Sequence, residues 1–345
     1  MVAGTAVSCG GELRDDGVAT AAAVTTDVDP STTTGEDPTA DASDSVASDG
    51  DTTDASIKLD VAGTAGSADD GGSADECQNV DVLFVIDDSS SMGDNQQSLV
   101  ASFPGFVAGM QANLQFAESY HIGIVTSDAY GANAPGCTDI GDLVTRTGGI
   151  AASGQVCEPF ASGKRYLDES EPDLAAKFAC AAQVGSSGAD DEKMMRGLLD
   201  ALDPAANDPA GNACNTGFAR DDSLLVIVLI SDEDDVPEPY MCDPADPFNN
   251  PCDTTGSGGS PDEWVAELAT KKSNIDSNVV VLSLVGLAGD NACGAVPASK
   301  LIGFANRFGD RGFTDDVCAA SYDGFFAAAL PIIDGACHDY VPPAR

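Results

Sequence analysis

The stretch DVLFVIDDSSSMG, residues 81–93, joins an apolar, β-branched run to a cluster of acidic and hydroxyl side chains. The run at residues 80–86 predicts a buried strand, because a strand covered on both faces is apolar throughout. Asp87, Ser89 and Ser91 follow at alternate positions, in a loop that leads toward a helix. Their oxygen atoms can converge on one point, and hard oxygen ligands of this kind are typical of a Mg²⁺ or Ca²⁺ site.

A second acidic cluster follows the most hydrophobic run of the chain, LLVIVLI at residues 224–230. Ser231 and four acidic residues, 232–235, come directly after it. The carboxyl ends of parallel strands meet at one edge of a sheet, so we expect the two clusters to share a crevice. For Asp88, Glu233, Asp234 and Asp235 we expect a solvated acidic rim; a second, calcium-type site is the alternative, although the twelve-residue loop pattern of an EF-hand is missing.

The rest of the folded region alternates strands and helices. Apolar runs predict further strands at residues 120–126 and 278–287. Helical spacing and a capping box at Ser260 predict helices at 95–114, 171–182, 190–202, 260–272, 298–308 and 322–336. Residues 128–170 form an irregular, cysteine-containing insertion, with a hairpin at 143–147 that turns at 148–149. This alternation predicts an α/β fold, doubly wound, with a mostly parallel central sheet and helices on both faces. The order of the strands stays open.

The N-terminal 75 residues differ from the rest. They hold 16 acidic residues, two basic ones and no aromatic residue. A segment this polar cannot offset the entropy lost on ordering, so residues 10–75 are expected to be a disordered acidic linker before a domain at 76–345.

Cys9 lies in the run AVSCG, which resembles the end of a bacterial lipoprotein signal peptide. Residues 1–9 are therefore interpreted as the remnant of a truncated signal, with Cys9 as the lipidation site. A chance run of small residues is the alternative. The chain has no stretch of about 20 apolar residues, so we expect membrane association only through such an anchor.

Eleven cysteines indicate an oxidising compartment, and ten of them lie in the folded region. We expect disulfides there, with Cys242–Cys252 the most favoured pair and Cys77–Cys337 a plausible one that would join the two ends of the domain. Buried free thiols are the alternative. The protein is accordingly expected to be extracytoplasmic, as an outer-membrane-anchored lipoprotein, a periplasmic protein or a secreted one.

Charge and motifs exclude several functions. A net charge of −42 is too acidic for nucleic acid or an anionic membrane as the main partner. The sequence has no nucleophile elbow, phosphate-binding glycine loop or His-Glu-x-x-His pair. Its two histidines, His121 and His338, are expected to be structural. A magnesium-dependent phosphotransferase or phosphatase with Asp87 as the nucleophile remains an alternative, although Ser89 stands where such enzymes usually carry a second carboxylate.

These motifs resemble the von Willebrand factor A (VWA) domain family over residues 78–340, in particular its cysteine-rich bacterial secreted and lipoprotein members. Asp87-x-Ser89-x-Ser91 resembles the start of that family's metal-ion-dependent adhesion site. The resemblance implies that Asp232 completes the site and that Ser186, from a middle loop, takes the place of a threonine. Ser187 and Thr126 are the alternatives for this last role.

By the same resemblance, the protein is not an enzyme. It is expected to be an adhesion-type domain that coordinates Mg²⁺ or Ca²⁺ and binds a protein ligand, whose acidic side chain completes the metal site. The family can also couple metal binding to a shift of its last helix, which a Cys77–Cys337 bridge would restrain. A structural lipoprotein with a vestigial site is a further alternative.

Overall fold

The computed structural model describes residues 77–113, 117–189, 191–235, 256–289, 291 and 293–343. The expectations for the signal remnant at 1–9 with Cys9, for the linker at 10–75 and for the Cys242–Cys252 pair lie outside these residues.

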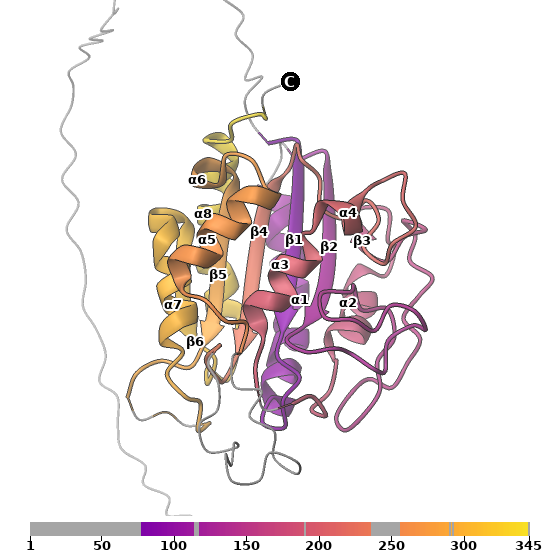
Figure 1. Cartoon of the computed structure of the whole chain (residues 1–345), viewed down its shortest axis with the longest axis vertical. Helices are drawn as coiled ribbons and strands as arrows, with labels where there is room; N and C mark the ends of the chain where they lie inside the picture. Colours follow the sequence, from indigo (N-terminus) through magenta and orange to yellow (C-terminus); the bar gives the residue numbers. More distant parts are fainter. Residues whose placement is uncertain are drawn as a thin grey trace, which may run out of the picture. The chain divides into compact units, whose positions relative to one another are not determined.

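A six-stranded sheet forms the centre of the domain, in the order β3-β2-β1-β4-β5-β6 (Figure 1). All neighbours pair in parallel except β2 and β3, which pair antiparallel. The doubly wound, mostly parallel sheet predicted from the sequence is thus confirmed. The strands are β1 (Asn79–Ile86), β2 (Ser119–Thr126), β3 (Leu167–Asp168), β4 (Leu224–Ser231), β5 (Val279–Val285) and β6 (Gly312–Asp316).

Helices cover both faces of this sheet. Alternate residues of the central strands point to opposite faces, so each face has its own apolar cluster. In Figure 1, α3 and α5 lie in front of the sheet and α1 lies behind it. The helices are α1 (Gly93–Asn113), α2 (Leu174–Ala182), α3 (Met194–Ala201), α4 (Pro204–Asn207), α5 (Pro261–Lys271), α6 (Ile275–Asn278), α7 (Ser299–Ala305), the 3-10 helix η1 (Asn306–Arg311) and α8 (Asp323–His338).

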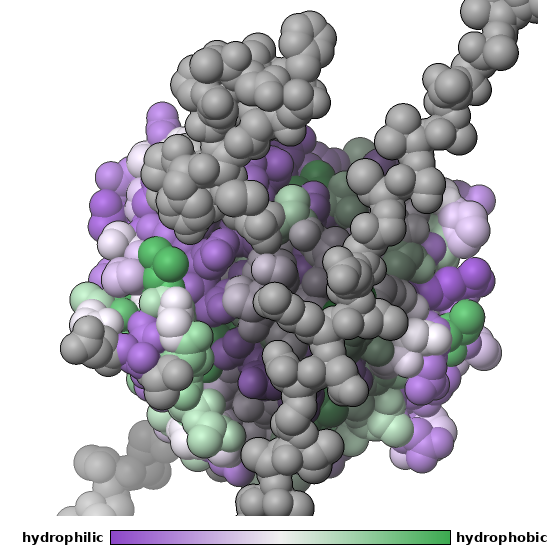
Figure 2. Space-filling model, turned by 90° about the horizontal axis from the view of Figure 1, so that it is seen from below, coloured by the Kyte–Doolittle hydropathy of each residue, from purple (hydrophilic) through white to green (hydrophobic). Residues whose placement is uncertain are grey.

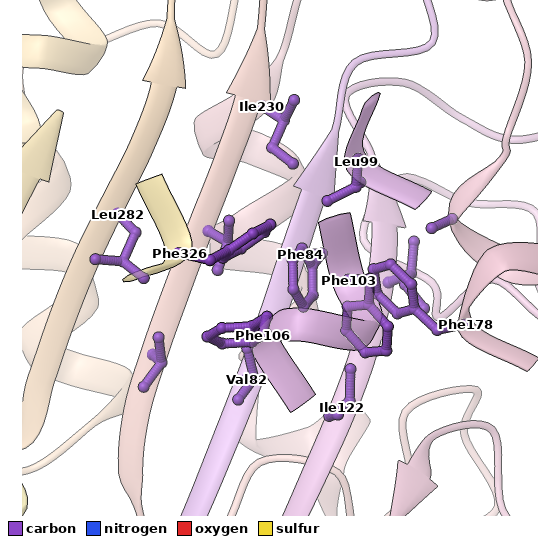
Figure 3. Close-up of a cluster of buried hydrophobic side chains, with 14 of the residues drawn as sticks. Val82, Phe84, Leu99, Phe103, Phe106, Ile122, Phe178, Ile230, Leu282 and Phe326 are labelled. Carbon is purple, nitrogen blue, oxygen red and sulfur yellow. The ribbon is translucent and has the colours of Figure 1, made fainter. Parts of the chain in front are cut away.

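Aromatic side chains hold α1, α2 and α8 against one face (Figure 3). The rings of Phe103 in α1 and Phe178 in α2 stack with centroids 3.4 Å apart. Phe84 of β1 meets Phe178 edge-on at 4.9 Å, and Phe106 packs on Phe326 of α8 at 4.6 Å. Buried aromatic pairs of this kind contribute about 0.5–1.5 kcal/mol each beyond their area. They fix α1, whose first turn follows the predicted metal loop.

Four disulfides crosslink the described residues. Cys77–Cys337 joins a residue two positions before β1 to the last turn of α8, as predicted. The other pairs are Cys137–Cys214, Cys157–Cys180 and Cys293–Cys318. This density is consistent with folding in an oxidising, extracytoplasmic compartment. Within the described residues, every helix is too short or too polar to cross a bilayer.

The structure departs from the sequence predictions at the edges of the sheet and at helix ends. The edge strands β3 and β6 were not predicted, and α3 begins at Met194 instead of residue 190. The helix expected at 298–308 ends at Ala305 and continues as η1. Arg146 and Val156 form an antiparallel bridge, so residues 143–147 do pair with a later segment, but the turn is a longer loop and not the predicted one at 148–149.

Candidate metal site

Asp87 is the first residue after β1 and is completely buried. Its backbone N–H donates to Ile230 of the neighbouring strand β4 (3.0 Å), which fixes the chain at the edge of the sheet. Its Oδ1 accepts a hydrogen bond from the Ser89 N–H (2.7 Å), and its Oδ2 lies 2.7 Å from the Ser231 hydroxyl. The carboxylate is therefore held rigidly between the loops after β1 and β4.

Ser89, Ser91 and Asp232 continue this arrangement toward the surface. The hydroxyl oxygens of Ser89 and Ser91 are 3.3 Å apart, and the Ser91 hydroxyl donates to Asp232 Oδ1 (3.0 Å). Ser89 is buried, whereas Ser91 is exposed. Four of the five predicted metal residues, from loops 141 residues apart, thus form one cluster of oxygen atoms that opens to solvent at Ser91.

The middle-loop hydroxyls have other partners. Ser186 is half-buried, and its hydroxyl lies 3.4 Å from the carbonyl oxygen of Ile150. The Ser187 hydroxyl accepts from the Ile150 N–H (2.9 Å), and the Thr126 hydroxyl donates to the carbonyl oxygen of Asp128 (2.9 Å). Among the described residues, none of these three hydroxyls hydrogen-bonds to the other predicted ligands.

Glu192 is a residue of this crevice that sequence reasoning missed. It lies two residues before α3 and is 1 % exposed. The nearby Ser127 hydroxyl donates to Asp88 Oδ1 (3.4 Å) and also lies near enough to Glu192 to lower its pKa, although neither Glu192 carboxylate oxygen has a hydrogen bond of regular geometry from the described residues. Glu192 interacts electrostatically with Asp87 and Asp88, so its carboxylate belongs to the same crevice.

The predicted solvated rim is wrong for three of its four residues, because Asp88, Asp234 and Asp235 are buried. Asp234 accepts from the first backbone N–H groups of α7 (Lys300 N at 2.9 Å), and Asp235 accepts from Met195 N in α3 (2.8 Å). Buried helix N-termini need such acceptors, because their first N–H groups have no partner within the helix. These two aspartates therefore position helices and are not free for a metal.

Burial disfavours the charged form of the crevice carboxylates. It raises the pKa of Asp87 to about 6, against the hydrogen bonds from Ser231 and Ser89, and the negative charge of Asp232 raises it further. Burial raises the pKa of Asp88 to about 7, with the charges of Asp128 and Asp87 adding to the effect. Burial also raises the pKa of Asp232, and that of Glu192 well above its usual range.

No Lys, Arg or His of the described residues forms a salt bridge with Asp87, Asp88, Glu192 or Asp232. Buried carboxylates normally have a cationic partner, because an unpaired buried charge is strongly destabilising. The ligand atoms here are carboxylate and hydroxyl oxygens, which suit Mg²⁺ or Ca²⁺. The residues present therefore fit a divalent cation.

The two histidines lie away from this crevice. His121 is near the start of β2, where its Nδ1 is 2.8 Å from the carbonyl oxygen of Phe218. His338 is the last residue of α8, with its Nδ1 2.8 Å from the carbonyl oxygen of Asp334. Figure 2 views the molecule from the side to which β1 and β4 run, where hydrophilic surface alternates with small hydrophobic patches.

No family model matches the chain, and no curated protein is significantly similar in sequence. Similar solved structures include proximal thread matrix protein 1 from the mussel byssus, at 13 % identity and a TM-score of 0.37, covering 76 % of this chain and 50 % of that one. A von Willebrand factor type A structure from Catenulispora acidiphila matches at 13 % and 0.31, covering 73 % and 42 %. The pilus adhesin SpaC from Lactobacillus rhamnosus GG matches at 15 % and 0.37, covering 75 % and 31 %. The chain thus spans half or less of these proteins.

Proposed function

We propose that this domain binds Mg²⁺ or Ca²⁺ through Asp87, Ser89, Ser91 and Asp232, and that the bound cation recruits a protein partner. The observation that carries the proposal is the hydrogen bond from Ser91 to Asp232 (3.0 Å), which closes the cluster across two loops. The resemblance to VWA domains in the sequence motif points to the same four residues.

The cluster supplies the ligand types that such an ion prefers. The Asp87 carboxylate accepts hydrogen bonds from the Ser89 N–H and from the hydroxyls of Ser231 and Ser89, and a carboxylate has about four lone-pair sites, so one remains for a cation. The hydroxyls of Ser89 and Ser91 can rotate their hydrogen atoms away and present oxygen. A bound cation would supply a positively charged centre that accepts electron pairs, in a protein whose net charge is strongly negative.

The exposed side of the site suits a partner protein. Ser90 and Ser91 are exposed while Asp87 and Ser89 are buried, so an ion there would be held from below and reached from solvent. A partner's Asp or Glu is the proposed ligand for the open position. Because the domain itself is acidic, attraction of an acidic partner would have to come from the cation.

The phosphotransferase alternative has less support. Such an enzyme would bring a phosphate dianion against the buried carboxylates, and no basic side chain of the described residues pairs with them. We therefore propose a binding protein and not an enzyme. Its proposed location is extracytoplasmic, with lipidation at Cys9 as the anchor.

Calorimetric titration of Mg²⁺ and Ca²⁺ into EDTA-treated protein tests the proposal. We expect binding in the wild type, a loss of at least one site in Asp232→Asn, and no change in Asp276→Asn, an exposed carboxylate in α6. No binding in the wild type would favour the vestigial site. Mg²⁺-dependent hydrolysis of p-nitrophenyl phosphate that disappears in Asp87→Asn would instead favour the enzyme.

A further inference from the structure

Four buried carboxylates share the crevice at the carboxyl ends of β1, β2 and β4. Asp87, Asp88, Glu192 and Asp232 are between 0 and 4 % exposed. A single divalent cation would neutralise half of their combined charge if all four are ionised. The two remaining negative charges would be buried without a partner, which destabilises a folded protein.

The four carboxylates fall into two pairs, each with its own hydroxyl groups. Asp87 and Asp232 lie with the hydroxyls of Ser89 and Ser91, as described above. Asp88 and Glu192 both lie near the hydroxyl of Ser127, which is 1 % exposed and follows the last residue of β2, and Glu192 also faces the charge of Asp87. The Ser127 hydroxyl is 3.4 Å from Asp88 Oδ1, and this long bond is the only hydrogen bond to the Asp88 carboxylate from another described residue.

The spacing of the acidic groups argues against one shared ion. In the described part of the chain, three acidic, Cys or His ligand atoms come within 4.8 Å of one another only at Cys137, Asp142 and Cys214, and both cysteines there are in a disulfide. Adjacent oxygen ligands of Mg²⁺ or Ca²⁺ lie about 3–3.5 Å apart, as its metal–oxygen distances require. In this arrangement, therefore, three of the four carboxylates do not occupy adjacent ligand positions of a single ion.

We propose that a second divalent cation binds between Asp88, Ser127 and Glu192, beside the site of Asp87 and Asp232. Glu192 supplies the strongest indication, because its carboxylate is 1 % exposed, has no hydrogen bond of regular geometry and has only the neutral Ser127 hydroxyl close by, which is little compensation for a buried charge. The residues come from three elements: the loop after β1, the end of β2 and the segment before α3. Two carboxylates and a hydroxyl, with water in the remaining positions, match the ligand sets of Mg²⁺ and Ca²⁺.

The loop at residues 185–188 is shaped to close this second site. Gly188 donates its N–H to the carbonyl oxygen of Asp88 (2.7 Å). A Cβ on Gly188 would lie 2.6 Å from Asp88 Cγ, so only glycine allows the loop to approach the carboxylate. On the outer side, half-buried Asp128 accepts from the N–H of Ala189 (3.1 Å) and adds its negative charge. The approach to the second site is therefore acidic, which favours entry of a cation.

The number of bound ions tests this proposal. Native mass spectrometry and calorimetry with Ca²⁺ and Mn²⁺, on EDTA-treated protein at pH 8, should give two ions for the wild type. Glu192→Gln and Asp88→Asn should each retain one ion, and so should Asp232→Asn. Ser127→Ala removes a single hydroxyl and should weaken one of the two binding events by about 10-fold, within the range seen when groups supporting a metal are lost. Near-ultraviolet circular dichroism checks that each variant is folded.

The outcomes separate the two sites. One ion in the wild type, lost in Asp232→Asn and unaffected by Glu192→Gln, would overturn the second site and leave the proposed function standing. One ion that is lost in Glu192→Gln and kept in Asp232→Asn would support the second site and refute the first. No bound ion in the folded wild type would overturn both.

Discussion

Asp88 allows a direct test of the electrostatics of the crevice, because its carboxylate is buried without a basic partner. Its pKa is raised from 3.8 to about 7, mainly by burial. A difference of about 3 units corresponds to about 4 kcal/mol, at 1.36 kcal/mol per unit. In cation-free protein, Asp88→Asn keeps the shape and removes the charge. We therefore expect the variant to be more stable than the wild type by up to about 4 kcal/mol at pH 8.

The sign of the effect depends on pH. The folded-state pKa of Asp88 lies above its unfolded value. Below about pH 4 the carboxyl is protonated in both states and does not lower the free energy of unfolding, whereas above about pH 7 its ionisation lowers that free energy by the full amount. The neighbouring charges of Asp128 and Asp87 act in the same direction, and the Ser127 hydroxyl acts against them. The advantage of Asp88→Asn should therefore shrink steadily as the pH falls from 8 toward 4.

Urea unfolding in EDTA, without reductant, measures this difference through the fluorescence of Trp264, the single tryptophan, which is buried. Asp94→Asn, an exposed carboxylate in the first turn of α1, is the matched control and should change little. Saturating Ca²⁺ should reverse the order, because the wild type then has a partner for its charge. An Asp88→Asn variant that is no more stable than the wild type at pH 8 in EDTA would refute the reasoning.

Three further changes have defined outcomes. Replacing Cys77 and Cys337 by serine opens a loop of 260 residues and should lower the free energy of unfolding by about 5.5 kcal/mol in the chain-entropy model, measured by urea unfolding. Gly188→Ala places a Cβ against Asp88 and should lower the melting temperature and weaken Ca²⁺ binding together, measured by calorimetry. Ser186→Ala should leave cation affinity unchanged in titrations, because its hydroxyl lies against Ile150.

Each of these has a matched comparison within the chain. Serine at Cys157 and Cys180, which close a loop of only 23 residues, should cost about 3.5 kcal/mol, less than the longer bridge. Gly131→Ala meets nothing within 4 Å and should be neutral. Ser91→Ala should weaken cation binding where Ser186→Ala does not. If Ser186→Ala weakened cation binding and Ser91→Ala did not, the middle-loop hydroxyl of Ser186 would be the ligand.

The central strands could be predicted because their sequences leave no alternative. All eight residues of β4 are buried, and a continuous apolar run of that length between turn signals is typical of a parallel strand covered on both faces. The acidic residues at its carboxyl end then had to lie beside those of β1, since the two strands pair in parallel from Val80 to Ile86. The contact between Ser91 and Asp232 follows from this register.

The edge strands could not be predicted, because they carry no such signal. β6 reads GFTDD, and each of its residues is only partly buried. An edge strand pairs on one side alone, so its sequence need not be apolar or alternate, and β-propensity is weakest as a guide in that setting. β3 is only two residues long and depends on antiparallel pairing with β2.

Glu192 was missed for a different reason: its local sequence, DDEK before an apolar helix, is typical of the first turn of a helix. Acidic residues are favoured there because they interact with the positive end of the helix dipole, and such residues are usually solvated. The structure begins α3 at Met194, which leaves Glu192 in the segment that leads into the helix. That segment is anchored where the Lys193 N–H donates to the carbonyl oxygen of Ser127 (3.1 Å), and the adjacent Glu192 is buried. Whether Glu192 is exposed or buried therefore depends on a shift of the helix start by a few residues. Short sequence patterns do not define helix starts to that precision.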